Sequence, residues 1–270
     1  KLDEMFRKDR ADFESKWNDM KIIIEYGMLT EDKFFDKAKK FAMYADTDGG
    51  LHTFEVYLES IKEQQTDKDK KTVVLYASNK DAQHSYIQNA KNKGYSVLLL
   101  DSPLTSHLLQ KLEQEHENTT FARVDSDLID NLIKKDETRV AKLSDKQKEE
   151  LKTRLETIVP KEKFTLKLED MDSTEAPLVI TVPEFMRRMK EMQMTGGGGM
   201  MGMGDFPDMY DLIVNANHPL ASKILDTEDA DARGTAVNQA LDLAKLQQNL
   251  LHGEELTAFI ARSYELLGNE

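Results

Sequence analysis

The spacing of hydrophobic residues changes along the chain and predicts different structures in different stretches. Up to about residue 65, apolar residues recur every three or four positions, which predicts a small helical unit. Two short apolar runs, 72–77 and 96–101, then flank a helical segment, 82–93, that Gly94 closes. Two strands bridged by a helix form a βαβ unit, so we expect a parallel sheet covered by helices.

The helical unit is interrupted by one polar loop, DTDGG at 46–50. Helices are expected before it at 12–18, 21–25 and 33–45, and another should follow it. The loop has some features of a calcium-binding EF-hand, because Asp46, Asp48 and Glu55 would fall at ligand positions. The first ligand, normally an aspartate, would be Tyr44, so we expect an ordinary interhelical loop and no metal site.

A domain boundary is expected in the charged, turn-rich stretch 125–144. Beyond it, the pattern predicts a helix at 145–158 and strands at 164–168, 178–182 and 211–216. The predicted fold class is therefore mixed α+β and α/β. Residues 1–135 would hold the helical unit (about 1–65) and a three-layer αβα parallel-sheet subdomain (about 70–130). Residues 136–270 would form a small α+β domain that ends in a helix pair.

The segment after the strand at 178–182 is the hardest to explain as ordinary core. Thr181 and Glu184 stand three apart, as in a capping box, and Pro183 suits a first turn, so a helix should begin here. We expect this helix on or beside the sheet of the second domain. One of its faces carries Phe185, Met186, Met189 and Met192, and the other carries Arg187, Arg188, Lys190 and Glu191.

Four consecutive glycines, Gly196–Gly199, follow this helix, and Met200, Met201 and Met203 lie just beyond them. Ordering such glycines costs much conformational entropy, so we expect a mobile segment. The spacing leaves two interpretations of the methionine face open. It could pack on the neighbouring strand as core, or it could form an adaptable apolar surface for varied partners, because thioether side chains are flexible and polarizable.

Two amphipathic helices close the chain and should form an αα-hairpin that turns near His252 and Gly253. Their apolar positions are Val237, Leu241, Ala244, Leu256, Phe259, Ile260 and Leu267. Two helices alone leave much of this surface uncovered. It could pack on the chain's own sheet or pair with an identical hairpin in a two-fold four-helix bundle, and the pattern favours neither.

Composition narrows the range of partners. The 270 residues, 39% of them hydrophobic, can fill the cores of two domains. A net charge of −13 repels nucleic acid and anionic membranes, which favours a protein partner. The lack of cysteine excludes disulfides and thiolate chemistry and fits the cytoplasm. We find no signal peptide and no membrane-length apolar run, and the first residue, Lys1, suggests a fragment.

No catalytic constellation is visible in the sequence. The six histidines are scattered, and Walker loops, GxSxG elbows and dinucleotide fingerprints are absent. Ser78 and Asp101 follow the two predicted parallel strands, where α/β enzymes bind small ligands, so a doubly wound enzyme domain is the alternative function. Because no glycine-rich phosphate loop accompanies them, we interpret both residues as strand-end caps.

Six segments follow one another in an order that is hard to reproduce by chance: YLESIKEQ, VVLYAS, VLLLDSPL, LVITVPEFMRRM, NANHPLASKIL and the closing helix pair. Together they resemble the heat-shock protein 90 chaperones, in particular the bacterial HtpG branch. The resemblance spans essentially the whole chain. It implies that residues 1–135 are the second part of the middle domain and that residues 136–270 are the C-terminal dimerisation domain.

The resemblance implies a role in the ATP-dependent folding of non-native client proteins under stress. ATP and magnesium would bind a domain upstream of Lys1, so we expect no cofactor, catalytic residue or ATPase activity in this fragment. The helix pair would form a cytoplasmic homodimer, without nucleic-acid or membrane partners. Client contacts would be made by Phe185, Met186, Met189, Met192 and Met194.

Two positions depart from the family pattern. Some bacterial members carry a client-facing tryptophan where this chain has His107, which we expect to point outward. The family's Asn-Pro-x-His-Pro turn has lost its first proline and is Asn215-Ala216-Asn217-His218-Pro219 here. We expect the turn to survive, because Asn217 can cap the following helix.

Overall fold

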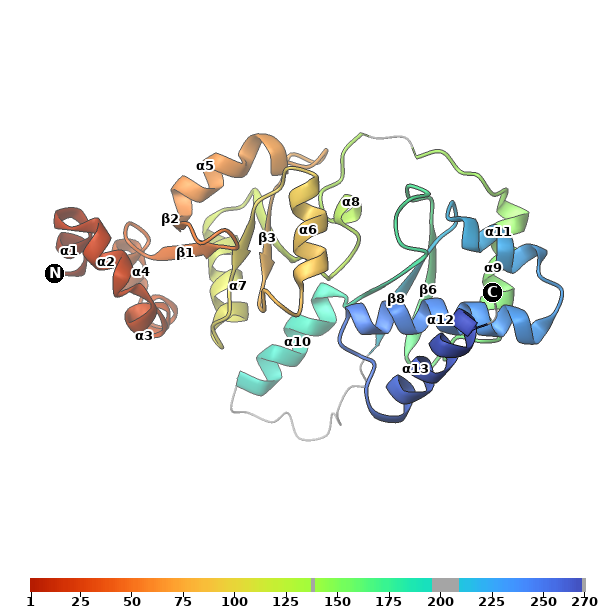
Figure 1. The fold of residues 1–270 in the computed structure, drawn as a ribbon. Coiled ribbons are helices and arrows are strands. Elements are labelled where there is room, and N and C mark those ends of the chain that lie inside the picture. The colour runs from red at the N-terminus through yellow and green to blue at the C-terminus, as the bar shows by residue number, and fades with distance from the viewer. Residues whose placement is uncertain (137–138, 196–208, 269–270) are drawn as a thin grey trace. The chain divides into compact units, whose positions relative to one another are not determined.

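The computed structural model describes residues 1–136, 139–195 and 209–268, without the side chains of 191–195. These residues form two compact units (Figure 1). The first unit runs to Asp136 and also includes the helix that begins at Glu184, and the second contains the rest of the described chain. The predicted mixture of helices and strands is confirmed.

The first unit opens with four helices, α1 (Leu2–Lys8), α2 (Arg10–Ser15), α3 (Trp17–Thr30) and α4 (Asp32–Ala38). The prediction of a helix over 33–45 is wrong in its second half, because the chain enters strand β1 (Met43–Asp46). Strand β1 pairs antiparallel with both β2 (Leu51–Thr53) and β4 (Val97–Leu99). Pairing on both sides therefore overrides the helical spacing of this stretch.

The DTDGG segment is the turn of the β1–β2 hairpin. Asp46 Oδ1 accepts hydrogen bonds from the backbone N–H groups of Asp48 and Gly50, each at 2.8 Å, and its Oδ2 lies 2.7 Å from His52 Nε2. Gly49 has a φ of 93°, a left-handed conformation that favours glycine. Both the interhelical loop and the EF-hand hypothesis are therefore wrong at these residues.

The first sheet has five strands in the order β2-β1-β4-β3-β5. Strand β3 (Thr72–Ala77) runs parallel to β4 and to β5 (Thr119–Arg123). Helix α6 (His84–Asn92) bridges β3 and β4, so the predicted βαβ unit is confirmed. Strand β5 was not predicted. It is an edge strand, so one row of its backbone groups has no neighbouring strand.

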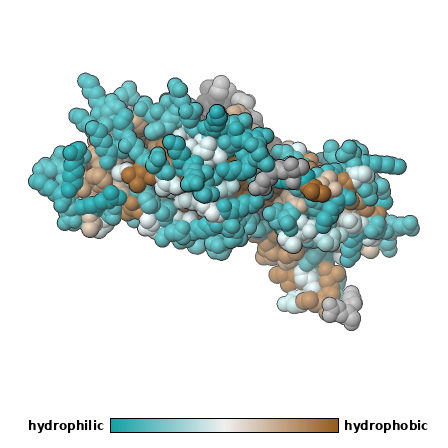
Figure 2. Space-filling view, turned by 90° about the horizontal axis from the view of Figure 1, so that it is seen from above, coloured by the Kyte–Doolittle hydropathy of each residue, from teal (hydrophilic) through white to brown (hydrophobic). Residues whose placement is uncertain are grey.

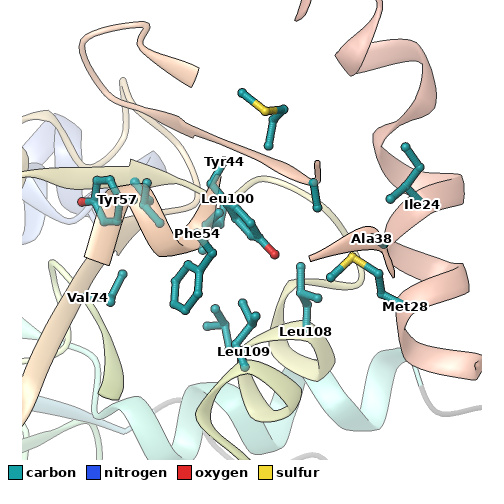
Figure 3. Close-up of a cluster of buried hydrophobic side chains, with 14 of the residues drawn as sticks. Ile24, Met28, Ala38, Tyr44, Phe54, Tyr57, Val74, Leu100, Leu108 and Leu109 are labelled. Carbon is teal, nitrogen blue, oxygen red and sulfur yellow. The ribbon is translucent and has the colours of Figure 1, made fainter. Parts of the chain in front are cut away.

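Helices α5 (Phe54–Gln65), α7 (Thr105–Glu115) and α8 (Ile129–Leu132) complete the part of the first unit that precedes residue 137. The side chains of Tyr44, Phe54 and Leu108 meet in its core (Figure 3). Trp17 is buried, with its ring centroid 6.1 Å from that of Phe13, and anchors the first helices. The three-layer arrangement proposed for this sheet stays a prediction.

The second unit is built on a three-stranded sheet in the order β6-β8-β7. Strand β8 (Tyr210–Asn215) runs parallel to β6 (Phe164–Glu169) and antiparallel to β7 (Leu178–Thr181), and all three strands were predicted. Its helices are α9 (Asp145–Glu156), α11 (Pro219–Asp226), α12 (Ala230–Gln247) and α13 (Gly253–Gly268). Helices α12 and α13 form the predicted αα-hairpin, and α13 has no buried residue.

The turn before α11 survives the loss of its proline, but its cap differs from the prediction. His218, not Asn217, is the N-cap, and its Nδ1 accepts a hydrogen bond from the Leu220 N–H at 3.0 Å. The Asn217 side chain instead joins three segments, through hydrogen bonds with the Lys142 N–H and the carbonyls of Val140 and Met171.

Candidate functional site

Helix α10 (Glu184–Thr195) belongs to the first unit, although it follows strand β7 of the second unit in sequence. Glu184 Oε1 accepts a hydrogen bond from the Tyr76 hydroxyl at 3.0 Å, and Glu184 Oε2 accepts one from the Arg123 N–H at 3.2 Å. Thr181 Oγ1 is buried without a hydrogen-bond partner in the described part of the chain. The predicted capping box is therefore wrong, and α10 groups with the first unit.

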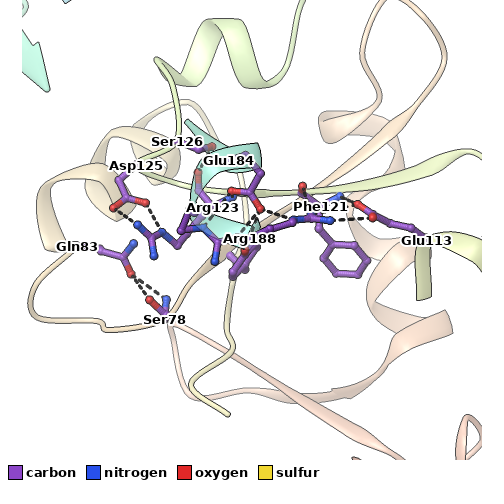
Figure 4. Close-up of polar contacts among 11 residues, drawn as sticks. Ser78, Gln83, Glu113, Phe121, Arg123, Asp125, Ser126, Glu184 and Arg188 are labelled. Atoms are coloured by element: carbon purple, nitrogen blue, oxygen red, sulfur yellow. Dashed lines mark hydrogen bonds and ion pairs between the residues drawn. The ribbon is translucent and has the colours of Figure 1, made fainter. Parts of the chain in front are cut away.

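The two arginines of α10 also contact other residues of the first unit, and Figure 4 shows Arg188 beside Glu113 and Phe121. Arg188 donates to Glu113 from Nη1 at 2.9 Å and from Nη2 at 3.2 Å, and its Nη2 also donates to the Phe121 carbonyl at 2.8 Å. Arg187 is only 7% exposed and donates to the Tyr76 hydroxyl. The face that carries both arginines therefore packs inward, because the first sheet and α7 supply partners for them.

Opposite charges compensate for the burial of this cluster. Burial alone would raise the pKa of Glu184, but Arg187 and Arg188 outweigh burial and hold that pKa below its ordinary value. Burial acts to lower the pKa of Arg188, but Glu113 and Glu184 raise it above its ordinary value. Burial, assisted by Glu184, raises the pKa of Tyr76. At neutral pH Glu184 and Arg188 are therefore ionised and Tyr76 is neutral.

The opposite side of α10 carries an apolar strip. Phe185 is 74% exposed, and Met186 and Met189 are half-buried. We call these three residues the α10 strip. The side chains of Met192 and Met194, and the glycine loop that follows, lie outside the described residues.

Comparison with known proteins identifies the family. The family described as Hsp90 protein matches residues 1–260. The chain belongs to the Hsp90 family. It is 37% identical to "Chaperone protein htpG" of Bacteroides fragilis (strain 638R) over 334 aligned residues, which cover 99% of this chain and 49% of that protein. It is 40% identical to "Chaperone protein HtpG" of Porphyromonas gingivalis (strain ATCC 33277) over 250 residues, covering 92% and 36% of the two chains.

The predicted resemblance to the Hsp90 chaperones of the HtpG branch is thereby confirmed. The first of these alignments shows that the chain spans about half the length of the curated relative it matches. The chain is therefore a member of a chaperone family.

The predicted dimerisation residues of this Hsp90-family chain divide into three groups by their exposure. Three of them, on α12, are buried in the core of the second unit: Val237, Leu241 and Ala244. They pack α12 against that core and do not form an accessible surface. Leu256 and Phe259 are half-buried. The remaining two, Ile260 and Leu267, are exposed.

Sequence reasoning overlooked other exposed apolar residues of the helix pair, namely Leu243, Leu246, Tyr264 and Leu266. Figure 2 shows hydrophobic surface gathered over this pair. Ile260, Tyr264 and Leu267 lie on one face of α13, because their spacing follows the helical repeat. We call these three residues the α13 face.

The strand-end residues considered for an enzyme have structural partners. Gln83 Oε1 accepts a hydrogen bond from the Ser78 N–H at 2.8 Å, and Lys21 Nζ lies 2.5 Å from Asp101 Oδ1. The His107 side chain is half-buried. Its Nδ1 is buried and has no hydrogen-bond partner among the described residues, so the side chain does not point fully outward as expected.

Two kinds of feature are absent from the described residues. Within that part of the chain, no group of three or more His, Asp or Glu side chains is arranged to hold a metal ion. In the same residues, no helix combines the length and apolar character needed to cross a membrane.

Proposed function

We propose that this chain is the client-binding and dimerising part of an ATP-dependent chaperone of the Hsp90 family. The observation that carries the client-binding role is the exposed Phe185, beside Met186 and Met189, on a helix whose opposite face is fixed by ion pairs. A fixed backbone that presents pliable apolar side chains suits weak binding of varied non-native segments.

The α13 face supports the dimerisation role. Tyr264 is 72% exposed and Leu267 is 75% exposed, and both would be buried if two copies of α13 packed in a two-fold bundle. Fully burying one large apolar side chain contributes about 1.5 to 3 kcal/mol. A dimer would also offer each client two α10 strips at a high effective concentration.

Nucleotide chemistry belongs to the same proposal. We expect ATP and magnesium to act in parts of the full-length protein outside these residues, and the chain itself to have no ATPase activity. Purified chain mixed with ATP and magnesium should release no phosphate above background, and sustained turnover would overturn this part. A cytoplasmic location, which the resemblance implies, completes the proposal.

The client-binding role can be tested by replacing the whole α10 strip with serine, as Phe185→Ser, Met186→Ser and Met189→Ser together. The variant should bind chemically denatured citrate synthase at least about tenfold more weakly, because a tenfold change needs only about 1.4 kcal/mol of lost apolar contact. Suppression of client aggregation and fluorescence anisotropy both measure this loss.

The matched control replaces three exposed apolar residues on another helix of the same unit, Ile22, Ile23 and Tyr26 of α3, with serine. The control should hold the client as the wild type does. Wild-type holding by the α10 variant would remove the α10 strip from the mechanism, and loss in the control alone would move the client surface to α3.

Dimerisation can be tested with Tyr264→Ser combined with Leu267→Ser, followed by sedimentation equilibrium. The variant should dissociate at least about tenfold more readily than the wild type, while Val56→Ser, at an exposed position of α5, should not change the equilibrium. A wild-type chain that stays monomeric at tens of micromolar, roughly the range of weak association, would overturn the proposal.

A further inference from the structure

Strand β5 forms an open edge of the first sheet. Alternate residues of a strand turn their backbone groups to opposite sides, and the Val124 N–H just beyond β5 bonds to the Tyr76 carbonyl of β3 at 2.9 Å. Phe121 and Arg123 therefore turn their backbone groups away from β3, towards the open edge. Unpaired groups at such an edge are a template for another strand.

Side chains take the place of the missing strand (Figure 4). The Phe121 N–H donates to Glu113 Oε1 at 2.8 Å, and the Phe121 carbonyl accepts from Arg188 Nη2 at 2.8 Å. The Arg123 N–H donates to Glu184 Oε2 at 3.2 Å. Each carboxylate thus accepts a hydrogen bond from a backbone N–H group, and the guanidinium donates one to a backbone carbonyl. These side chains therefore supply the acceptors and the donor that a neighbouring strand would supply.

The three side chains are also bonded to one another. Arg188 Nε donates to Glu184 Oε1 at 2.7 Å, and Arg188 Nη1 donates to Glu113 Oε2 at 2.9 Å. All three side chains are largely buried. Removing one partner from such a buried network leaves an uncompensated charge, so α10 is held in one register and one orientation.

We propose that Glu184 and Arg188 are positioning residues, which together with Glu113 dock α10 by replacing the missing neighbour of β5. We call these three residues the edge clamp. The clamp fixes the arginine side of α10 against the sheet, and it thereby fixes the direction in which the α10 strip faces. This inference rests on the proposed function, because it takes the α10 strip as the client surface.

The main test is Arg188→Glu in the full chain, with amide hydrogen exchange measured residue by residue. The substitution sets a third carboxylate beside Glu113 and Glu184 and opposite the Phe121 carbonyl. Exchange at Phe121 and Arg123 should become about a hundredfold faster, since breaking a buried ion pair has a large cost. The Val124 amide, bonded to β3, should keep its protection. Unchanged exchange at Phe121 and Arg123 would overturn the clamp.

A charge-swapped variant, Glu113→Arg with Arg188→Glu, separates the edge clamp from an ordinary ion pair. It restores opposite charges, but it places a donor against the Phe121 N–H and an acceptor against the Phe121 carbonyl. We therefore expect exchange at Phe121 to stay fast. Full recovery of protection would show that charge attraction alone docks α10 and would overturn the edge clamp. Lys8→Glu, in the exposed Lys8–Glu4 pair of α1, is the matched control and should change nothing.

A milder variant guards against unfolding of the unit by Arg188→Glu. Glu184→Gln keeps the shape of the side chain and removes its charge, so exchange should rise at Arg123 more than at Phe121. Fluorescence of the buried Trp17 reports whether the first unit remains folded in each variant. Unchanged exchange at Arg123 in a folded Glu184→Gln protein would also overturn the clamp.

Client binding in the same variants separates this inference from the proposed function. Arg188→Glu should weaken the holding of denatured citrate synthase about tenfold, and serine substitution of the α10 strip should weaken holding while Phe121 and Arg123 stay protected. Fast exchange with normal holding would overturn the positioning role. Normal holding by the serine variant would overturn the proposed client surface and leave the edge clamp as a docking device.

Discussion

Replacing Glu25 with glutamine should stabilise the first unit at neutral pH. Glu25 lies on α3 with 7% exposure, and its Oε2 has no hydrogen-bond partner within the described residues. Burial raises the pKa of Glu25, and Asp101 adds to this effect, while a hydrogen bond with Ser102 and the charge of Lys21 oppose it. A buried ionised group with incomplete partners costs about 1 to 3 kcal/mol, so we expect Glu25→Gln to add roughly 1 to 2 kcal/mol to the free energy of unfolding.

The pH dependence of this gain has a definite sign. Because the pKa of Glu25 is higher in the folded than in the unfolded state, the folded state binds the proton more tightly. Ionisation of Glu25 therefore reduces stability as the pH rises through the folded pKa. The difference between variant and wild type should be full at pH 7.5 and should shrink as the pH falls towards the ordinary value of 4.5.

Trp17 makes the measurement specific for the first unit, since it is the only tryptophan and is buried there. Urea unfolding followed by its fluorescence gives the free energy of this unit without a signal from the second. Glu59→Gln, at an exposed position, is the control and should change the free energy by less than about 0.5 kcal/mol. A destabilised Glu25→Gln variant, or a gain that does not vary with pH, would refute the argument.

Two further predictions concern turns. Asn217→Ala removes three hydrogen bonds that join separate segments, so it should lower the free energy of unfolding of the second unit by about 2 to 4 kcal/mol in hydrogen exchange. The exposed Asn92→Ala is its control, and an equal effect of both would contradict the structural role of Asn217. Millimolar calcium should leave the urea transition of Trp17 unchanged, because the Asp46 carboxylate is engaged within its own hairpin. A raised midpoint would contradict that assignment.

Strands with a strong local signal could be predicted from the sequence, and strands that depend on distant partners could not. The apolar runs of β3, β4 and β7 are bounded by turn residues, so each of these strands can be recognised from its own residues. Strand β5 has the sequence TTFAR, whose alternation is weak, and it is held by pairing with β3 and by the edge clamp. Strand β1 was similarly concealed by helical spacing that continues from α4.

The candidate site was predictable in composition but not in orientation. An amphipathic pattern separates two faces of a helix, and it does not say which of them meets the rest of the protein. In α10 the charged face packs inward, because Tyr76 and Glu113 supply partners from far away in the sequence. One local signal was available, since Glu184 stands three and four positions before Arg187 and Arg188, a spacing typical of ion pairs within a helix.

The open edge of β5 is completed by a helix that the ribosome makes much later. Arg188 follows Arg123 by 65 positions, which corresponds to roughly 3 to 13 s of synthesis at about 5 to 20 residues per second. Throughout that interval a nascent chain carries the Phe121 carbonyl and the Arg123 N–H without their α10 partners, so a neighbouring nascent chain on the same messenger can pair with them. Slow codons between these two arginines should therefore promote co-translational aggregation, and slow codons placed after α10 should not.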